Sequence, residues 1–120
     1  MTKRTLIVGA SQKPDRYSFI ATNMLAEYGH PVYPYGMRAG NINEHAIETN
    51  WPVGEHFDTV TLYLNPSNQA PYMEQILALK PKRVVFNPGT ENPVFEAQLR
   101  DAGIEAIEAC TLVLLRTQQY

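Results

Sequence analysis

The segment from Thr5 to Gly29 contains a short apolar run, a turn and an amphipathic helix in direct succession. The apolar run, Leu6 to Val8, is rich in branched residues and predicts a strand that is buried on both faces of a parallel sheet. Gly9 ends this strand. Ser18 is a favourable N-cap for the helix that follows, and Gly29 supplies its C-terminal stop. A strand that passes through a short turn into a helix favours an α/β fold.

Strand and helix signals alternate along the rest of the chain. Runs of β-branched, aromatic and apolar residues predict strands at residues 31–35, 59–64, 83–87 and 104–107, and apolar residues at helical spacing predict helices at 70–80 and 92–102. The interval from 36 to 58 is less regular, and we expect a helical turn at 43–48 and a short edge strand at 49–52. Residues 111–115 form an apolar tail that must be covered.

This alternation predicts one Rossmann-like domain over residues 1–120. Right-handed βαβ crossovers place helices on both faces of a sheet, so we expect three layers around a mostly parallel sheet of about five or six strands. A chain of 120 residues, of which 44% are hydrophobic, suffices for a single core and leaves no room for a second domain.

The composition narrows the function classes. The net charge of −2 gives no general attraction to nucleic acid, so anion binding depends on local donors. The single cysteine, Cys110, excludes an intramolecular disulfide and a thiolate metal cluster. The first apolar run is too short for a signal peptide and no later run spans a bilayer. We therefore expect a cytoplasmic protein that binds neither nucleic acid nor a membrane.

The loops that follow the parallel strands are expected to meet at one edge of the sheet, at residues 9–16, 36–38, 65–68 and 87–91. The first loop offers backbone N–H groups, the positive end of a helix dipole and two cationic side chains, which together predict a phosphate site. Its candidate residues are Gly9, Ala10, Ser11, Gln12, Lys13, Arg16 and Ser18. It is not a full glycine-rich fingerprint, so a turn without a ligand is the plain alternative.

The second loop favours a phosphorylated ribose. An NAD site requires an acidic residue at the end of the second strand, whereas this chain has Arg38 nearby. A guanidinium matches phosphate geometry, as in NADP or the 3′-phosphate of coenzyme A. A solvated surface arginine is the alternative.

The third and fourth loops both begin with an Asn-Pro pair, Asn65-Pro66 and Asn87-Pro88. The proline cannot continue a central strand, and the asparagine brings a short amide to the edge of a cleft. Gly89 permits a close approach of a ligand. Strand termination explains these residues equally well.

Taken together, these motifs resemble a known family. They are Val8-Gly9-Ala10-Ser11 with Pro14-Asp15-Arg16-Tyr17-Ser18, then Pro31-Val32-Tyr33-Pro34 followed by Arg38, then Asn87-Pro88-Gly89 and Cys110. In register through nearly the whole chain, this combination resembles the small stand-alone coenzyme-A-binding proteins, which are similar to the N-terminal domain of the succinyl-CoA synthetase α subunit.

The resemblance implies a Rossmann-like domain that binds the diphosphate of coenzyme A at Ser11 to Lys13, with Arg16 nearby. It implies that Arg38 meets the nucleotide phosphate and that the loops beginning at Asn65 and Asn87 flank adenine and pantetheine. The phosphorylated histidine of the synthetase lies in a second domain that 120 residues cannot include, so ligase activity is not implied.

No residue pattern indicates catalysis. The three histidines lack metal-ligand spacing, and Asp15 and Glu91 do not form a recognisable acid/base pair. Cys110 fits a buried small hydrophobe better than an acyl acceptor. We expect a coenzyme A or acyl-CoA binding module without catalytic or metal-binding residues. The alternatives are a small NADP-binding domain and a ligand-free homodimer that buries Leu112, Leu114 and Tyr120 between chains.

Overall fold

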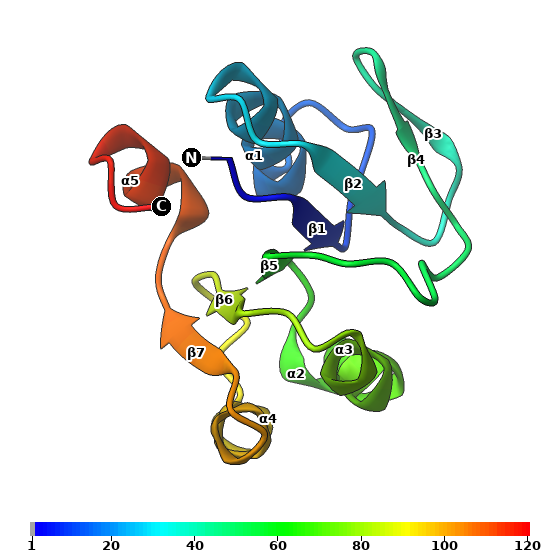
Figure 1. Cartoon of the computed structure of the whole chain (residues 1–120). Coiled ribbons are helices and arrows are strands. Elements are labelled where there is room, and N and C mark those ends of the chain that lie inside the picture. The colour runs from blue at the N-terminus through cyan, green and yellow to red at the C-terminus, as the bar shows by residue number, and fades with distance from the viewer. Residues whose placement is uncertain (1) are drawn as a thin grey trace.

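The computed structural model describes residues 2–120 and contains a five-stranded sheet in which every strand runs parallel to its neighbours (Figure 1). The strand order is β2-β1-β5-β6-β7. The strands are β1 (Thr5–Val8), β2 (Val32–Tyr35), β5 (Thr59–Leu62), β6 (Arg83–Phe86) and β7 (Glu105–Glu108). The predicted α/β, Rossmann-like architecture with a parallel sheet of about five strands is therefore confirmed.

Helices cover both faces of the sheet, which gives the three layers seen in Figure 1. They are α1 (Tyr17–Glu27), α2 (Pro66–Gln69), the 3-10 turn η1 (Ala70–Tyr72), α3 (Met73–Leu79), α4 (Pro93–Asp101) and α5 (Thr111–Arg116). Helices α1 and α5 lie on one face, and α3 and α4 lie on the other.

Side chains of β1 alternate between the two cores, as the twofold period of a strand requires. Leu6 and Val8 belong to the larger core with Phe86 and Phe95, and Ile7 belongs to the smaller core with Leu25. All three β1 side chains are fully buried. A short run of branched residues thus becomes the centre of the sheet because both of its faces exclude water.

The irregular interval folds as an antiparallel hairpin of β3 (Gly40–Ile42) and β4 (His45–Ile47), so the predicted helical turn at 43–48 is wrong. Asn43 takes a positive φ of 54° in the two-residue turn, and the buried Ile42 and Ile47 follow strand rather than helix spacing. The predicted edge strand at 49–52 is also wrong. Residues 49–52 belong to no strand, and pairing with β2 ends at the preceding residue, Glu48, in an isolated parallel bridge to Tyr35.

Two helix predictions need correction. Helix α1 begins at Tyr17 with Arg16 in the N-cap position, so Ser18 is not the cap. Ser18 is buried, and its carbonyl accepts a hydrogen bond from the Thr22 hydroxyl. The helix expected at 70–80 begins earlier, at the Asn65 cap, and is divided at η1, where Pro71 lacks the N–H group that a continuous helix needs. The apolar tail forms α5, whose Leu112 and Leu115 are buried.

The side chain of Asn87 joins three elements at the carboxyl edge of the sheet. Its Nδ2 donates to Thr61 Oγ1 at 2.7 Å and to the Leu62 carbonyl at 2.8 Å. Its Oδ1 accepts from the backbone N–H of Thr111 at 2.9 Å. Asn87 is 3% exposed, so water does not replace these bonds. The amide therefore fixes the end of β5 and the start of α5 relative to β6.

We expect Asn87→Ala to lower the free energy of unfolding by about 2–4 kcal/mol, because it leaves buried donors and acceptors unpaired. Urea denaturation measures this loss. Asn68→Ala, at an exposed position of α2, is the matched control and should change stability little. Equal effects of the two substitutions would contradict the role of Asn87.

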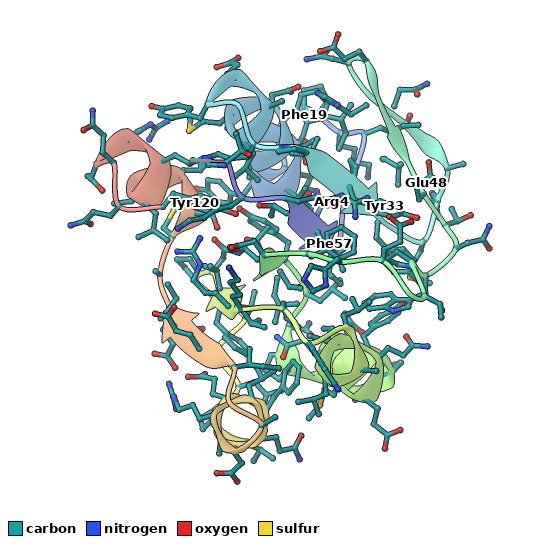
Figure 2. The ribbon with its side chains drawn as sticks, in the orientation of Figure 1. Arg4, Phe19, Tyr33, Glu48, Phe57 and Tyr120 are labelled. Carbon is teal, nitrogen blue, oxygen red and sulfur yellow. The ribbon has the colours of Figure 1, made fainter. Side chains whose placement is uncertain are left out.

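The opposite edge of the sheet is closed by stacked side chains (Figure 2). The Arg4 guanidinium lies 4.5 Å from the centre of the Phe57 ring, which meets Tyr33 edge-on. Arg83 lies 4.5 Å from the ring centre of Tyr120. His30 is half-buried against Tyr120 and accepts a hydrogen bond at Nδ1 from the backbone N–H of Lys3.

Burial and the nearby Lys3 charge lower the pKa of His30 below its ordinary value of 6.5. Because the unfolded chain then binds this proton more readily than the folded protein, His30 makes stability rise with pH between its lowered pKa and 6.5. An NMR titration of the His30 ring should show the lowered pKa, and His30→Gln should remove this part of the pH dependence. A His30 pKa at or above 6.5 would contradict the inference.

Candidate functional site

The loops that follow β1, β2, β5 and β6 lie together at the carboxyl edge of the sheet. From β1 the chain first adds β2 on one side of the sheet and then crosses to add β5 on the other side. The switch point of the sheet therefore lies between β1 and β5. Three connected hollows follow this edge, and we call them the outer cavity, the middle cavity and the inner chamber. Neighbouring hollows share lining residues, so they form one cleft.

The outer cavity has a volume of about 350 Å³. It is lined by the first loop from Gly9 to Lys13 and by Arg16, Met37, Arg38 and Leu64. The structure thus brings the phosphate candidates of the first loop together with Arg38, although Arg38 follows them by more than twenty positions in the chain.

Three cations in the outer cavity lack a carboxylate partner. Within residues 2–120, no hydrogen bond or ion pair involves the charged groups of Lys13, Arg16 or Arg38, and all three side chains are exposed. Like charges that share a cavity repel one another, and an anion between them relieves this repulsion. The outer cavity is therefore suited to a ligand with several negative charges.

The N-terminus of α1 lies against this cavity and has no side-chain cap. Arg16, in the N-cap position, makes no capping hydrogen bond, and the first turn carries no acidic residue. The early N–H groups of a helix lack partners inside the helix and carry the positive end of its dipole. An anionic ligand would satisfy them.

Some backbone N–H groups of the first loop already donate hydrogen bonds within the protein, and others remain for a ligand. The N–H groups of Gly9 and Ala10 both donate to the Tyr35 carbonyl, at 3.0 and 2.9 Å, so they are not free for a ligand. Gly9 has a φ of 98° and contributes the shape of the turn. The N–H of Lys13 donates to Ser11 Oγ at 3.2 Å. Donors for a ligand therefore come from later positions of the loop and from the start of α1.

Close packing against the loop after β2 holds the first loop in place. A Cβ atom on Gly36 would lie 2.5 Å from the backbone oxygen of Ala10. A Cβ atom on Gly40 would lie 2.5 Å from the side-chain oxygen of Gln12. Gly36 has no positive φ, so the space beside Ala10, rather than backbone conformation, requires the glycine.

The middle cavity, of about 230 Å³, connects the outer cavity to the inner chamber. The predicted residues Ser18, Asn65, Pro88 and Gly89 line it. Asn65 also caps α2, since its Oδ1 accepts from the backbone N–H of Asn68 at 3.0 Å. Pro66 begins α2 and lines none of the three hollows.

Gln69 holds the third and fourth loops together and was not a predicted site residue. Its Nε2 donates to the carbonyls of Leu64 and Thr90, both at 2.7 Å, and its Oε1 accepts from Asn92 Nδ2 at 3.0 Å. The side chain is 1% exposed. A single glutamine in a short helix belongs to no motif, so only the structure reveals this bridge.

The inner chamber has a volume of about 190 Å³ and is lined by Tyr17, Tyr63, Asn87, Pro88, Cys110 and Leu112. The amide of Asn87 is already engaged with the protein, so it serves as a wall of the chamber. Cys110 is a free, half-buried thiol. Sequence reasoning missed Tyr17, Tyr63 and Leu112 as site residues. Their signal was weak, because aromatic and leucine residues are typical of any core.

The described residues hold no group of three or more histidine, cysteine, aspartate or glutamate residues placed to bind a metal. None of the helices in residues 2–120 combines the length and the apolar character that crossing a membrane requires. What the edge does present is a cationic, uncapped helix start beside a long cleft at the switch point of a parallel sheet. This arrangement defines a Rossmann-like domain, a class in which ligands typically bind at this edge of the sheet.

Comparison with known proteins agrees with this class. A sequence model described as "CoA binding domain" matches residues 3–116, and the chain belongs to this family. No curated protein matches the chain significantly.

Several solved structures are similar over the whole chain. An uncharacterised protein is 44% identical, with a TM-score of 0.96 over 100% of this chain and 99% of the other. A protein from Thermus thermophilus is 26% identical, with a TM-score of 0.83 over 98% and 91% of the two chains. A hypothetical protein from Pyrococcus horikoshii is 24% identical, with a TM-score of 0.86 over 98% and 83%, and shares the fold.

We expect Gly36→Ala to lower the free energy of unfolding by about 1–3 kcal/mol, because its methyl group would press against backbone that cannot easily move. Gly40→Ala is the matched control and should have a smaller effect, since the Gln12 side chain can rotate away. Thermal or urea unfolding of both variants gives the comparison. The reverse order of the two losses would contradict the packing described for the first loop.

Proposed function

We propose that this protein binds coenzyme A, or an acyl thioester of it, along the cleft and catalyses no reaction by itself. The observation that carries the proposal is the uncapped N-terminus of α1 beside the unpartnered Lys13, Arg16 and Arg38 in the outer cavity. Membership of the CoA binding domain family supports it.

The order of the three hollows matches the order of chemical groups in coenzyme A. The outer cavity is cationic and suits the diphosphate, held by the first loop and the start of α1, with Arg38 on the ribose phosphate. The middle cavity, with Asn65 and Gly89 in its wall, suits the amide-containing pantetheine arm. The inner chamber then receives the thiol end.

Asn87 has a positioning role in this proposal. Both protons of its amide group are donated to β5, and its oxygen holds α5, so the ligand meets Pro88 and Gly89 rather than the Asn87 amide. Of the three residues expected between chains in the homodimer alternative, Leu112 is 6% exposed, and Leu114 and Tyr120 are half-buried. The Tyr120 ring packs against Arg83 and His30 of the same chain.

The cytoplasm is the setting we propose, because the one cysteine of this chain forms no disulfide. Isothermal titration with coenzyme A, dephospho-coenzyme A, NADP and NAD tests the ligand. We expect coenzyme A to bind most tightly. Absence of binding at millimolar coenzyme A would overturn the proposal, and tighter binding of NADP would replace it with the NADP-binding alternative.

We expect Arg38→Glu to weaken coenzyme A about tenfold or more and dephospho-coenzyme A much less, because the reversed charge repels only the phosphate that the second ligand lacks. Lys82→Glu makes the same change of charge at the other end of the sheet, beside the start of β6, and should leave both affinities unchanged. Equal losses for the two ligands in Arg38→Glu would contradict the assigned role of Arg38.

A further inference from the structure

The inner chamber extends the cleft beyond the length that the nucleotide and the pantetheine arm require. It shares Tyr17, Tyr63 and Pro88 with the middle cavity, so a ligand can pass from one into the other. Two aromatic rings, a proline, a leucine and a thiol make up its wall beside the engaged Asn87. Such a lining does not favour a charged group, but it favours an apolar one.

Tyr63 forms one side of this apolar space, and its hydroxyl lies behind the wall. The hydroxyl is buried beside the hydroxyls of Thr61 and Thr111, which bond to each other at 2.8 Å. Burial is the main cause that raises the pKa of Tyr63, and the two threonine hydroxyls act in the opposite direction. The chamber is therefore lined by the ring of Tyr63 and not by a free donor.

Only the thiol end of free coenzyme A would reach this space, whereas an acyl thioester extends an apolar chain beyond the sulfur. An apolar lining stabilises such a chain more than it stabilises the thiol alone.

We propose that the inner chamber holds the acyl group of a short-chain acyl thioester against its apolar wall. This inference rests on the proposed function, because it assumes that the pantetheine arm enters through the middle cavity. It adds that the preferred ligand is an acyl-CoA of limited chain length rather than free coenzyme A.

The size of the chamber sets the expected chain length. A chamber of about 190 Å³ is smaller than the roughly 300–1,000 Å³ of pockets that hold drug-sized ligands, so it suits a short acyl chain such as butyryl. A longer chain must leave the chamber past Tyr17, which is 71% exposed, and its added methylenes remain in water.

Competition binding of coenzyme A, acetyl-CoA, butyryl-CoA and decanoyl-CoA tests the inference, in excess reductant so that Cys110 cannot form a disulfide with the ligand. Each of the two additional methylenes should tighten binding about fourfold, so butyryl-CoA should bind roughly fifteenfold more tightly than acetyl-CoA. Decanoyl-CoA should bind no more tightly than butyryl-CoA. Equal affinities for the four ligands would overturn the inference but leave coenzyme A binding intact, whereas binding of none would overturn the proposed function itself.

Two substitutions of Cys110 test whether the volume of the chamber or the reactivity of the thiol selects the acyl group. Cys110→Met fills part of the chamber and should reduce the ratio of butyryl-CoA to coenzyme A affinity about tenfold. Cys110→Ser keeps the volume and should keep that ratio. Loss of the ratio in Cys110→Ser would overturn the inference, because it would show that the thiol rather than the space selects the acyl group.

Discussion

The buried amide of Asn87 joins the ends of β5 and β6 to the start of α5, and the geometry of the cleft depends on this connection. Parallel strands align their carboxyl ends, but they do not fix the loops that follow them. An asparagine can do so because its side chain both donates and accepts. With its donors on β5 and its acceptor on α5, Asn87 fixes the fourth loop beside the start of α5, and the inner chamber lies at this junction.

Different residues determine the shape of the cleft and supply its positive charge. The N–H groups of Gly9 and Ala10 donate to the Tyr35 carbonyl, and these two residues, together with Gly36, set the path of the first loop. The cations Lys13, Arg16 and Arg38 remain unpartnered in the outer cavity, beside a helix start that no side chain caps. Repulsion among these cations destabilises the outer cavity. An anionic ligand bound there would remove that repulsion and stabilise the fold.

Local sequence patterns predicted the strands and helices whose stability depends on residues close to them in the chain. Leu6 to Val8 could be assigned to a buried strand, and Asn92 with Pro93 to a helix start, because strand burial and helix capping act within a few residues. The hairpin at 40–47 was predicted as a helical turn, since its strands are three residues long and gain stability only from packing beside β2 and against the first loop. Ser18 has the chemistry of a cap, yet tertiary packing buries it inside α1.

The sequence by itself determined the order of strands and helices, and with it the edge of the sheet at which the loops gather, because parallel crossovers allow few arrangements. It also determined the residue types offered to a phosphate there. Only the tertiary structure decided which groups remain free. Hydrogen bonds between distant segments of residues 2–120 engage the amide of Asn87 but none of the charged groups of Lys13, Arg16 and Arg38, and no spacing within the chain records such pairings.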